Sequence, residues 1–222
     1  MKKTLGILMA LLLLFPNITN GQEDDEWSKA VKKEYKTKLK DFKKQGWKVF
    51  GSSRTIEVLL HTHLDWLNYH PNVYEIVGVA NGFKSMNLGR QMAMNNAYVT
   101  YASQMSSVIK GRAISDMKAD ASNQNSEFDQ FFAVFERYVE KEIRGEIKES
   151  FSLIREKGNG VYEMQSFFLV NEEAASDARR RALKYAAQET MTAQKYADIV
   201  SKYINEKIYP HQFHADDAQK DL

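Results

Sequence analysis

The chain contains no cysteine among its 222 residues. This absence excludes disulfide bonds, thiolate catalysis, zinc sites built from cysteine and lipid attachment at a cysteine side chain. Only three prolines and eleven glycines are present, which argues against a linker-rich or low-complexity chain. With 43% hydrophobic residues, the composition is typical of a folded globular protein.

The N-terminal segment has the features of a secretory signal peptide. Lys2 and Lys3 are positively charged, residues 5–15 form an apolar run, and a short polar stretch ends at the small residue Gly21. The run is shorter than the roughly 20 residues that a membrane-spanning helix needs, so the pattern indicates a cleaved export signal. We therefore predict cleavage after Gly21. We expect a protein of the periplasm or the outer-membrane periphery, without a lipid anchor or a transmembrane segment.

Removal of this segment changes the charge balance. Of the 31 Lys and Arg residues, Lys2 and Lys3 lie in the signal, so 29 remain against 29 Asp and Glu. A neutral exported protein lacks the net positive charge typical of nucleic-acid binding. We therefore expect no nucleic-acid partner.

Hydrophobic periodicity divides the remainder into helical and extended segments. Apolar residues every three or four positions predict helices at 26–44, 85–108, 126–144 and 172–208. Runs rich in β-branched residues predict strands at 73–80, 109–118, 147–155 and 161–170. Residues 55–69 suit either a buried helix or a strand with a following turn, and we favour the helix. Asn81-Gly82 is predicted to end the first strand, and Lys157-Gly158-Asn159-Gly160 to form a hairpin turn.

These elements predict an α+β protein in which a small antiparallel sheet packs against alanine-rich helices. Ala93 and Ala97 fall on one line of the 85–108 helix, so this line is expected to approach the sheet closely. We divide the chain into the signal (1–21), an N-terminal basic helical arm (22–50), a single α+β domain (51–209) and a flexible tail (210–222).

Part of this order of elements resembles a known family. The run Val77-Gly78-Val79-Ala80-Asn81-Gly82, then a helix carrying Ala93, Ala97 and Ala102, then a strand and a hairpin, resembles the domain of the Lpp-twenty envelope lipoproteins and their relatives in flagellar assembly. The likeness covers residues 73–171. It implies an envelope protein without catalytic residues. Family members that are lipoproteins carry a cysteine after the signal, and this chain has none.

One motif points to chemistry of a different class. The sequence His61-Thr62-His63-Leu64-Asp65-Trp66 resembles the H-x-H-x-D-H motif of the metallo-β-lactamase fold, whose metal activates water. Trp66 replaces the last histidine, and the further histidines expected at intermediate distance are missing. On a helix, His61 and His63 would point about 200° apart. A metal-dependent hydrolase using His61, His63 and Asp65 is the alternative hypothesis, but we assign no catalytic, cofactor-binding or metal-binding residue.

The predicted first helix carries the one feature that suggests an interaction. Nine lysines lie between Lys29 and Lys48, against the acids Glu34 and Asp41. An apolar stripe shares the helix, formed by Trp27, Val31, Tyr35, Leu39 and Phe42. The stripe either packs on the domain, which we expect, or helps the lysines to bind an anionic lipid or polymer. We therefore predict a non-enzymatic envelope-associated protein that binds an envelope protein or an anionic surface.

Two further clusters have simpler interpretations. A row of aromatic residues at helical spacing is predicted to lie in the core; it consists of Phe128, Phe131, Phe132 and Phe135. In the tail, His211, His214, Asp216 and Asp217 form a weak chelating cluster of a kind that needs no function.

Overall fold

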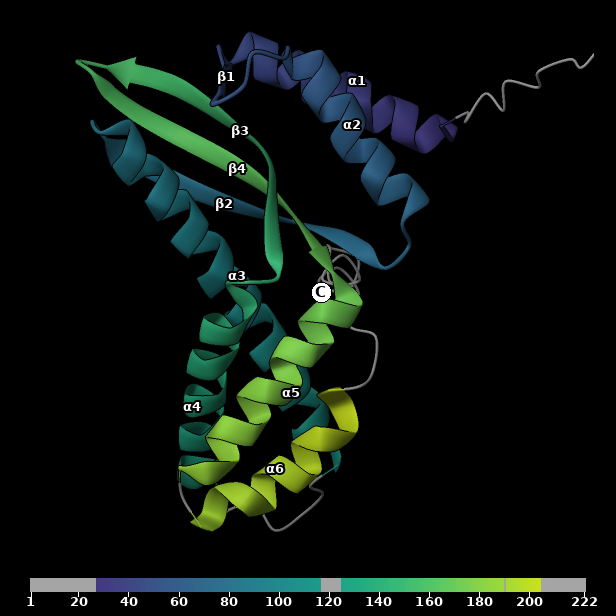
Figure 1. Ribbon diagram of the computed structural model, residues 1–222, viewed down its shortest axis with the longest axis vertical. Helices are drawn as coiled ribbons and strands as arrows, with labels where there is room; N and C mark the ends of the chain where they lie inside the picture. The colour runs from purple at the N-terminus through teal and green to yellow at the C-terminus, as the bar shows by residue number, and fades with distance from the viewer. Residues whose placement is uncertain (1–26, 117–124, 190, 205–222) are drawn as a thin grey trace, which may run out of the picture.

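The computed structural model describes residues 27–116, 125–189 and 191–204. Its elements in chain order are α1 (Lys29–Lys44), β1 (Lys48–Phe50), α2 (Ile56–Tyr69), β2 (Val73–Phe83), α3 (Met86–Asp116), α4 (Asn125–Ile143), β3 (Ile147–Gly158), β4 (Val161–Asn171), α5 (Glu172–Gln188) and α6 (Met191–Ile204). The predicted α+β class is confirmed: an antiparallel sheet packs against helices (Figure 1). The signal peptide and the residues of the tail fall outside the described ranges.

The sheet has four strands in the order β1-β3-β4-β2, and every neighbouring pair is antiparallel. The predicted hairpin between β3 and β4 is confirmed. Gly158 pairs with Val161, and the two residues between them, Asn159 and Gly160, have φ angles of 54° and 67°. Positive φ at both central positions belongs to the turn type whose twist matches paired strands, and Asn-Gly is the sequence that favours it.

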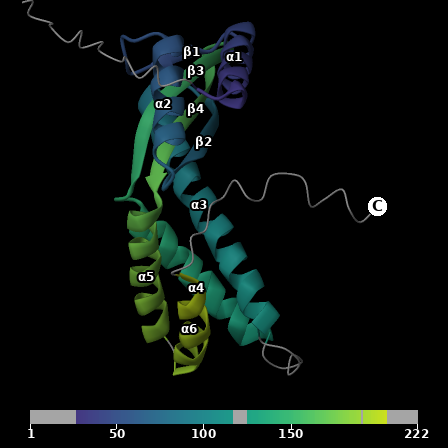
Figure 2. The ribbon, with the colours of Figure 1, turned by 90° about the vertical axis from the view of Figure 1, so that its right-hand side faces the viewer.

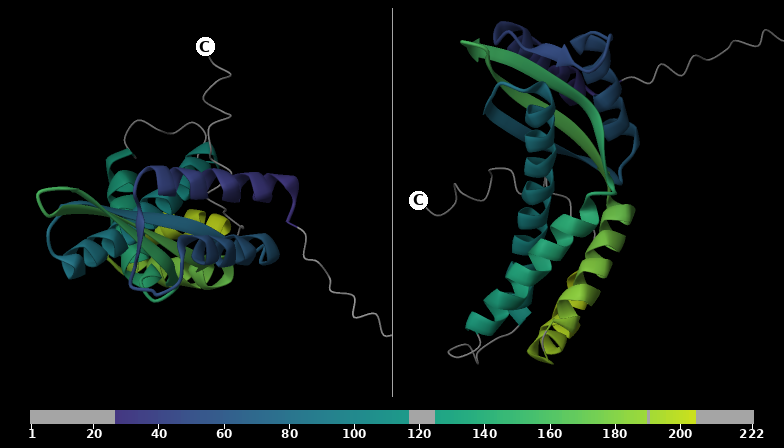
Figure 3. Two further views of the ribbon diagram at one scale, coloured as in Figure 1. Left: turned by 90° about the horizontal axis from the view of Figure 1, so that it is seen from above. Right: turned by 60° about the vertical axis from the view of Figure 1, so that its left-hand side comes forward.

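Helices cover both faces of the sheet and then extend beyond it. α1 and α2 lie over one face, whereas the first half of α3 lies under the other (Figures 1 and 3). The rest of α3 runs away from the sheet and packs with α4, α5 and α6 into a helical lobe (Figure 2). The molecule is therefore elongated, with a sheet lobe and a helical lobe that share α3.

The apolar stripe of α1 packs on the sheet lobe, as expected. Trp27 and Phe42 are each only 8% exposed, and they join a cluster that includes Phe151 and Phe167 of the sheet. Val31, Tyr35 and Leu39 are half-buried against the same cluster. Ser28 starts the helix, because its hydroxyl accepts a hydrogen bond from the backbone N–H of Val31 at 3.2 Å.

The prediction that residues 109–118 form a strand is wrong, since α3 continues to Asp116. Met105, Ile109 and Ala113 are fully buried and four residues apart, so they extend the inner side of the helix into the helical lobe. The β-branched residues at 108 and 109 therefore mark a buried helix and not a strand. Met117 and Lys118 lie outside the described residues.

The single helix predicted at 172–208 is also corrected. It is two helices, α5 and α6, separated after Gln188. Glu189 stands at the break, where Arg137 binds its carboxylate at 2.5 Å and Tyr138 donates to it at 2.8 Å. Ala193, Tyr196, Val200 and Ile204 of α6 are buried in the core that also contains the inner residues of α5. Because α6 folds back on α5, the buried sides of both helices face one core. A continuous helix would carry the buried residues of α6 away from that core.

Two details of the sheet also differ from the prediction. The short strand β1 was not predicted; it lies at the edge of the sheet and pairs Lys48–Phe50 with β3. Asn81-Gly82 does not end β2 but forms an irregularity within it, after which Phe83 still pairs with Tyr162. Gly82 has a φ of 73°, which suits a bulge that needs glycine.

The aromatic row of α4 lies in the core, as predicted. Phe128, Phe131, Phe132 and Phe135 are between 0% and 4% exposed.

A buried polar cluster connects two helices of this core. Arg179, fully buried, donates to Glu172 at 2.6 Å and to the Tyr101 hydroxyl at 2.7 Å. Its pairing with Glu172, within α5, compensates for burial of the charge, and its hydrogen bond to Tyr101 connects α5 to α3.

Candidate functional site

The structure divides the histidine motif of α2 between two separate clusters. His61 and Asp65 lie one turn apart on the same side, with His61 Nδ1 2.9 Å from an Asp65 carboxylate oxygen. Trp27 stacks on the His61 ring at 4.2 Å and donates from its indole N–H to Asp65 at 2.5 Å. This first cluster attaches the beginning of α1 to α2.

His63 lies on the inner side of α2, fully buried. Its Nε2 is 2.6 Å from a carboxylate oxygen of Glu75 on β2, and its ring contacts Phe151 and Phe167 at centroid distances of 5.4 and 6.0 Å. Its Nδ1 has no hydrogen-bond partner in the part of the chain that the structure describes. His61 and His63 thus have different partners, and no three His, Asp or Glu side chains within the described ranges converge as a metal site.

Glu75 connects the buried histidine to the underside of α1. Lys38 of α1 lies 3.5 Å from Glu75 and 2.9 Å from Glu34. Burial alone would raise the pKa of Glu75, but the hydrogen bond from His63 and the charge of Lys38 outweigh it and hold this pKa below its ordinary value. For Lys38, burial acts to lower the pKa, but Glu75 and Glu34 raise it above its ordinary value. The ion pair between Lys38 and Glu75 therefore adds to the apolar contacts that hold α1 on the sheet lobe.

The outer side of α1 carries a row of exposed lysines, which we call the lysine stripe. It consists of Lys29, Lys33, Lys36, Lys40 and Lys44. Steps of three or four residues place them on one side of the helix. From first to last they span about 22 Å at 1.5 Å per residue. The stripe lies opposite Phe42 and Lys38, which face the sheet lobe.

The stripe differs from the other lysines of α1 in its partners. Lys38 pairs with Glu34 and Glu75, and Lys43 pairs with Glu57 at 2.5 Å. Across the described ranges, no carboxylate forms an ion pair with a lysine of the stripe. An open depression follows this side of the helix, lined by Lys29, Lys32, Lys33, Lys36, Thr37, Lys40 and Asp41. Within the described ranges the stripe is thus a row of positive charge without ion pairs, with Asp41 as the acid that lines the same depression.

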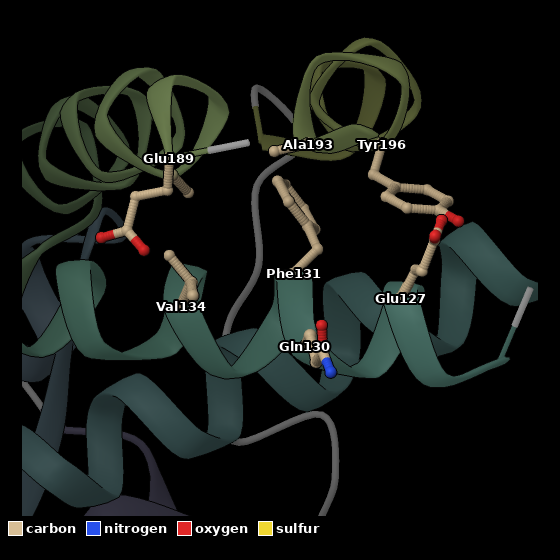
Figure 4. A pocket seen from close by; sticks show the side chains of 8 residues that line it. Glu127, Gln130, Phe131, Val134, Glu189, Ala193 and Tyr196 are labelled. Carbon is tan, nitrogen blue, oxygen red and sulfur yellow. The ribbon is translucent and has the colours of Figure 1, made fainter. Parts of the chain in front are cut away.

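A second hollow lies in the helical lobe, between α4 and the turn from α5 to α6 (Figure 4). It is lined by Glu127, Gln130, Phe131, Val134, Ala186, Glu189, Ala193 and Tyr196. Its volume of about 110 Å³ is well below the roughly 300 Å³ at which small-molecule sites begin. The carboxylate of Glu189 is already bound by Arg137 and Tyr138. This pocket is therefore a gap in helix packing and not the better candidate for a site.

The lysines of α1 were predicted from the sequence, but the ion-pair partners that distinguish them were not. Glu75 gave a weak signal, as a charged residue within the apolar run of β2, and nothing in the sequence pairs it with His63 or Lys38. The weak chelating cluster of the tail, His211, His214, Asp216 and Asp217, lies outside the described residues.

Comparison of the chain with models of protein families, with curated proteins and with solved structures finds no match. Within the described ranges, no helix combines the length and the apolar character needed to cross a bilayer.

Proposed function

We propose that this is an exported, non-enzymatic envelope-associated protein that acts by binding an anionic partner or surface through the lysine stripe. The observation that carries the proposal is the row of five exposed lysines that pair with no acidic side chain in the part of the chain that the structure describes. Five like charges on one side of a helix repel each other, and an anionic surface would relieve that repulsion.

The envelope location rests on other observations. The first 21 residues have the pattern of an export signal. The segment 73–171 resembles the Lpp-twenty envelope proteins, which are anchored at the envelope. The alternative of a metal-dependent hydrolase receives no similar support, because His61 pairs with Asp65 whereas His63 pairs with Glu75.

The proposal is tested with two matched variants of the purified protein. The stripe variant changes all five stripe lysines to glutamine. The control variant changes five exposed lysines elsewhere to glutamine, namely Lys141, Lys148, Lys184, Lys195 and Lys202. Both variants lose the same charge, so only the position of the charge differs.

Binding is measured against two anionic probes, phosphatidylglycerol vesicles and dextran sulfate, over a series of salt concentrations. Each lysine close to an anionic surface contributes about 1 kcal/mol, so the stripe variant is expected to lose most of the affinity and the control variant little. The affinity of the wild type should fall steeply as salt rises, because the Debye length shrinks to about 8 Å at physiological salt. If the wild type binds neither probe, or both variants lose equally, the proposal is wrong.

A further inference from the structure

The outer side of α2 exposes apolar and aromatic side chains beside the lysine stripe. Val58 and Tyr69 lie eleven residues apart on one side of the helix, and they are 47% and 40% exposed. Trp66, on the adjoining side, is 46% exposed and stacks on His70 with ring centroids 4.0 Å apart. Tryptophan is enriched at interfaces where one end of the ring is apolar and the other wet, so an exposed Trp66 near other exposed apolar side chains marks a candidate contact surface.

The outer sides of α1 and α2 face in the same direction. The inner sides of both helices, including Phe42 of α1 and Leu60 and Leu64 of α2, reach one cluster on the same face of the sheet. The sides opposite these residues must therefore both point away from the sheet. The left panel of Figure 3 looks down on this pair of helices. One flat partner can contact the lysine stripe and the exposed side of α2 together.

Two of the acidic groups near this face already have partners, whereas Asp41 lines the depression beside the stripe. Asp65 accepts a hydrogen bond from Trp27 and lies against His61, and Glu57 is paired with Lys43. Hydrogen bonds from Lys43, from the backbone and from Thr55 lower the pKa of Glu57 to about 2. Asp65 and Glu57 therefore have partners within the protein, whereas no described carboxylate pairs with a stripe lysine.

We infer that the outer face of α1 and α2 docks on a bilayer that contains anionic phospholipid. The lysine stripe would contact the phosphates, and Trp66 and Tyr69 would enter the interfacial region, where amphipathic rings are most stable. A hydrophilic anionic polymer could bind the lysines, but it offers no apolar phase for Val58 and Trp66. The inference rests on the proposed function and adds the identity of the surface and a role for α2.

Tryptophan fluorescence provides a direct test, because the chain has three tryptophans. Trp27 and Trp47 are buried, at 8% and 5% exposed, so only Trp66 is open to solvent. On addition of phosphatidylglycerol vesicles, we expect the emission to shift to the blue and to be quenched by lipids brominated near the headgroup end of the chain. Phosphatidylcholine vesicles should produce neither effect.

The variant Trp66→Phe should lose the blue shift and the quenching while still binding vesicles, because phenylalanine keeps an apolar ring. Trp66→Ser should bind more weakly than Trp66→Phe. For the stripe, each Lys→Gln change should reduce vesicle affinity about fivefold. Melting temperatures of all variants should match the wild type, since the substituted side chains are exposed.

The outcomes separate the inference from the proposed function. Stripe-dependent binding to dextran sulfate without binding to vesicles overturns the inference and leaves the proposed function standing. Vesicle binding in which Trp66 is neither shifted nor quenched also overturns it, because α2 then takes no part. If the protein binds neither vesicles nor dextran sulfate, both the inference and the proposed function are wrong.

Discussion

Gly78 of β2 and Ala93 of α3 approach each other through their backbones. A Cβ atom on Gly78 would lie 2.0 Å from the carbonyl oxygen of Ala93 and 3.1 Å from the Cβ of Ala97. The long helix α3 can therefore cross the sheet only where small residues meet. Both alanines are fully buried, so this crossing fixes how the sheet lobe joins the helical lobe.

The substitution Gly78→Ala should therefore be strongly destabilising. The obstructing atom belongs to the backbone and cannot rotate away, so the helix must move, and overpacking of this kind costs about 1–3 kcal/mol or more. Gly111→Ala in the same helix is the control. Its Cβ would meet nothing within 4 Å, and alanine is the better helix former by up to about 1 kcal/mol. Urea unfolding measures both; equal stability of the two variants would contradict the described crossing.

Ala97→Leu tests the same contact from the helix side. The larger side chain enters a fully buried position and should lower the free energy of unfolding by about 1–3 kcal/mol. Ala30→Leu, at an exposed position of α1, should change it by less than about 0.5 kcal/mol. Identical melting temperatures for Ala97→Leu and the wild type would show that another side of α3 faces the sheet.

Phe42→Ala tests whether α1 belongs to the folded core. Phe42 is 8% exposed and its ring lies 5.8 Å from that of Phe167 in an edge-to-face contact. Its removal should cost about 3–5 kcal/mol, whereas Lys36→Ala on the outer side should have little effect on stability. If Phe42→Ala leaves the free energy of unfolding unchanged, α1 is a detached arm in solution.

The link between Glu75, His63 and Lys38 predicts acid sensitivity. The pKa of Glu75 is lowered in the folded protein, so the folded state binds this proton more weakly than the unfolded state. The stabilising contribution is present above the unfolded pKa of about 4.5 and is lost as pH falls through the lower folded pKa. Melting temperatures from pH 7 to pH 3 should therefore fall.

Glu75→Gln is the matched variant for this test. It cannot ionise, so it should be less stable than the wild type at pH 7 and should lose less on acidification. Parallel pH profiles for the two proteins would show that this carboxylate does not contribute.

The predicted export signal implies that the mature protein lacks residues 1–21. Intact-mass measurement of the protein recovered from the envelope fraction should give a first residue of Gln22, because cleavage after Gly21 removes the apolar run. A chain that retains residues 5–15 would disprove the signal-peptide prediction.

Much of the fold was predictable because its signals are local. Asn159-Gly160 specifies a hairpin turn through two positive φ angles, and the spacing of Trp27, Val31, Tyr35, Leu39 and Phe42 specifies the buried side of α1. The prediction of a strand at 109–118 was wrong because the deciding signal there is not local. Val108 and Ile109 suit a strand because they are β-branched, and only their packing in the helical lobe makes the segment helical.

The candidate site likewise depends on both local sequence signals and long-range contacts. The positions of the lysines along α1 follow from the sequence alone, because helical periodicity places steps of three and four on one side. Which of them carry free charge was decided by the tertiary structure, which brings Glu75 to Lys38 and Glu57 to Lys43. Likewise, His61 and His63 are only two residues apart in sequence but point to different sides of α2, because a helix rotates about 100° per residue. Glu75 of β2 reaches only His63. The sequence by itself thus determined the β3–β4 hairpin and the amphipathic sides of helices such as α1. The folded structure decided which charges are paired and which stay exposed without an ion pair among the described residues, since those pairings join residues distant along the chain.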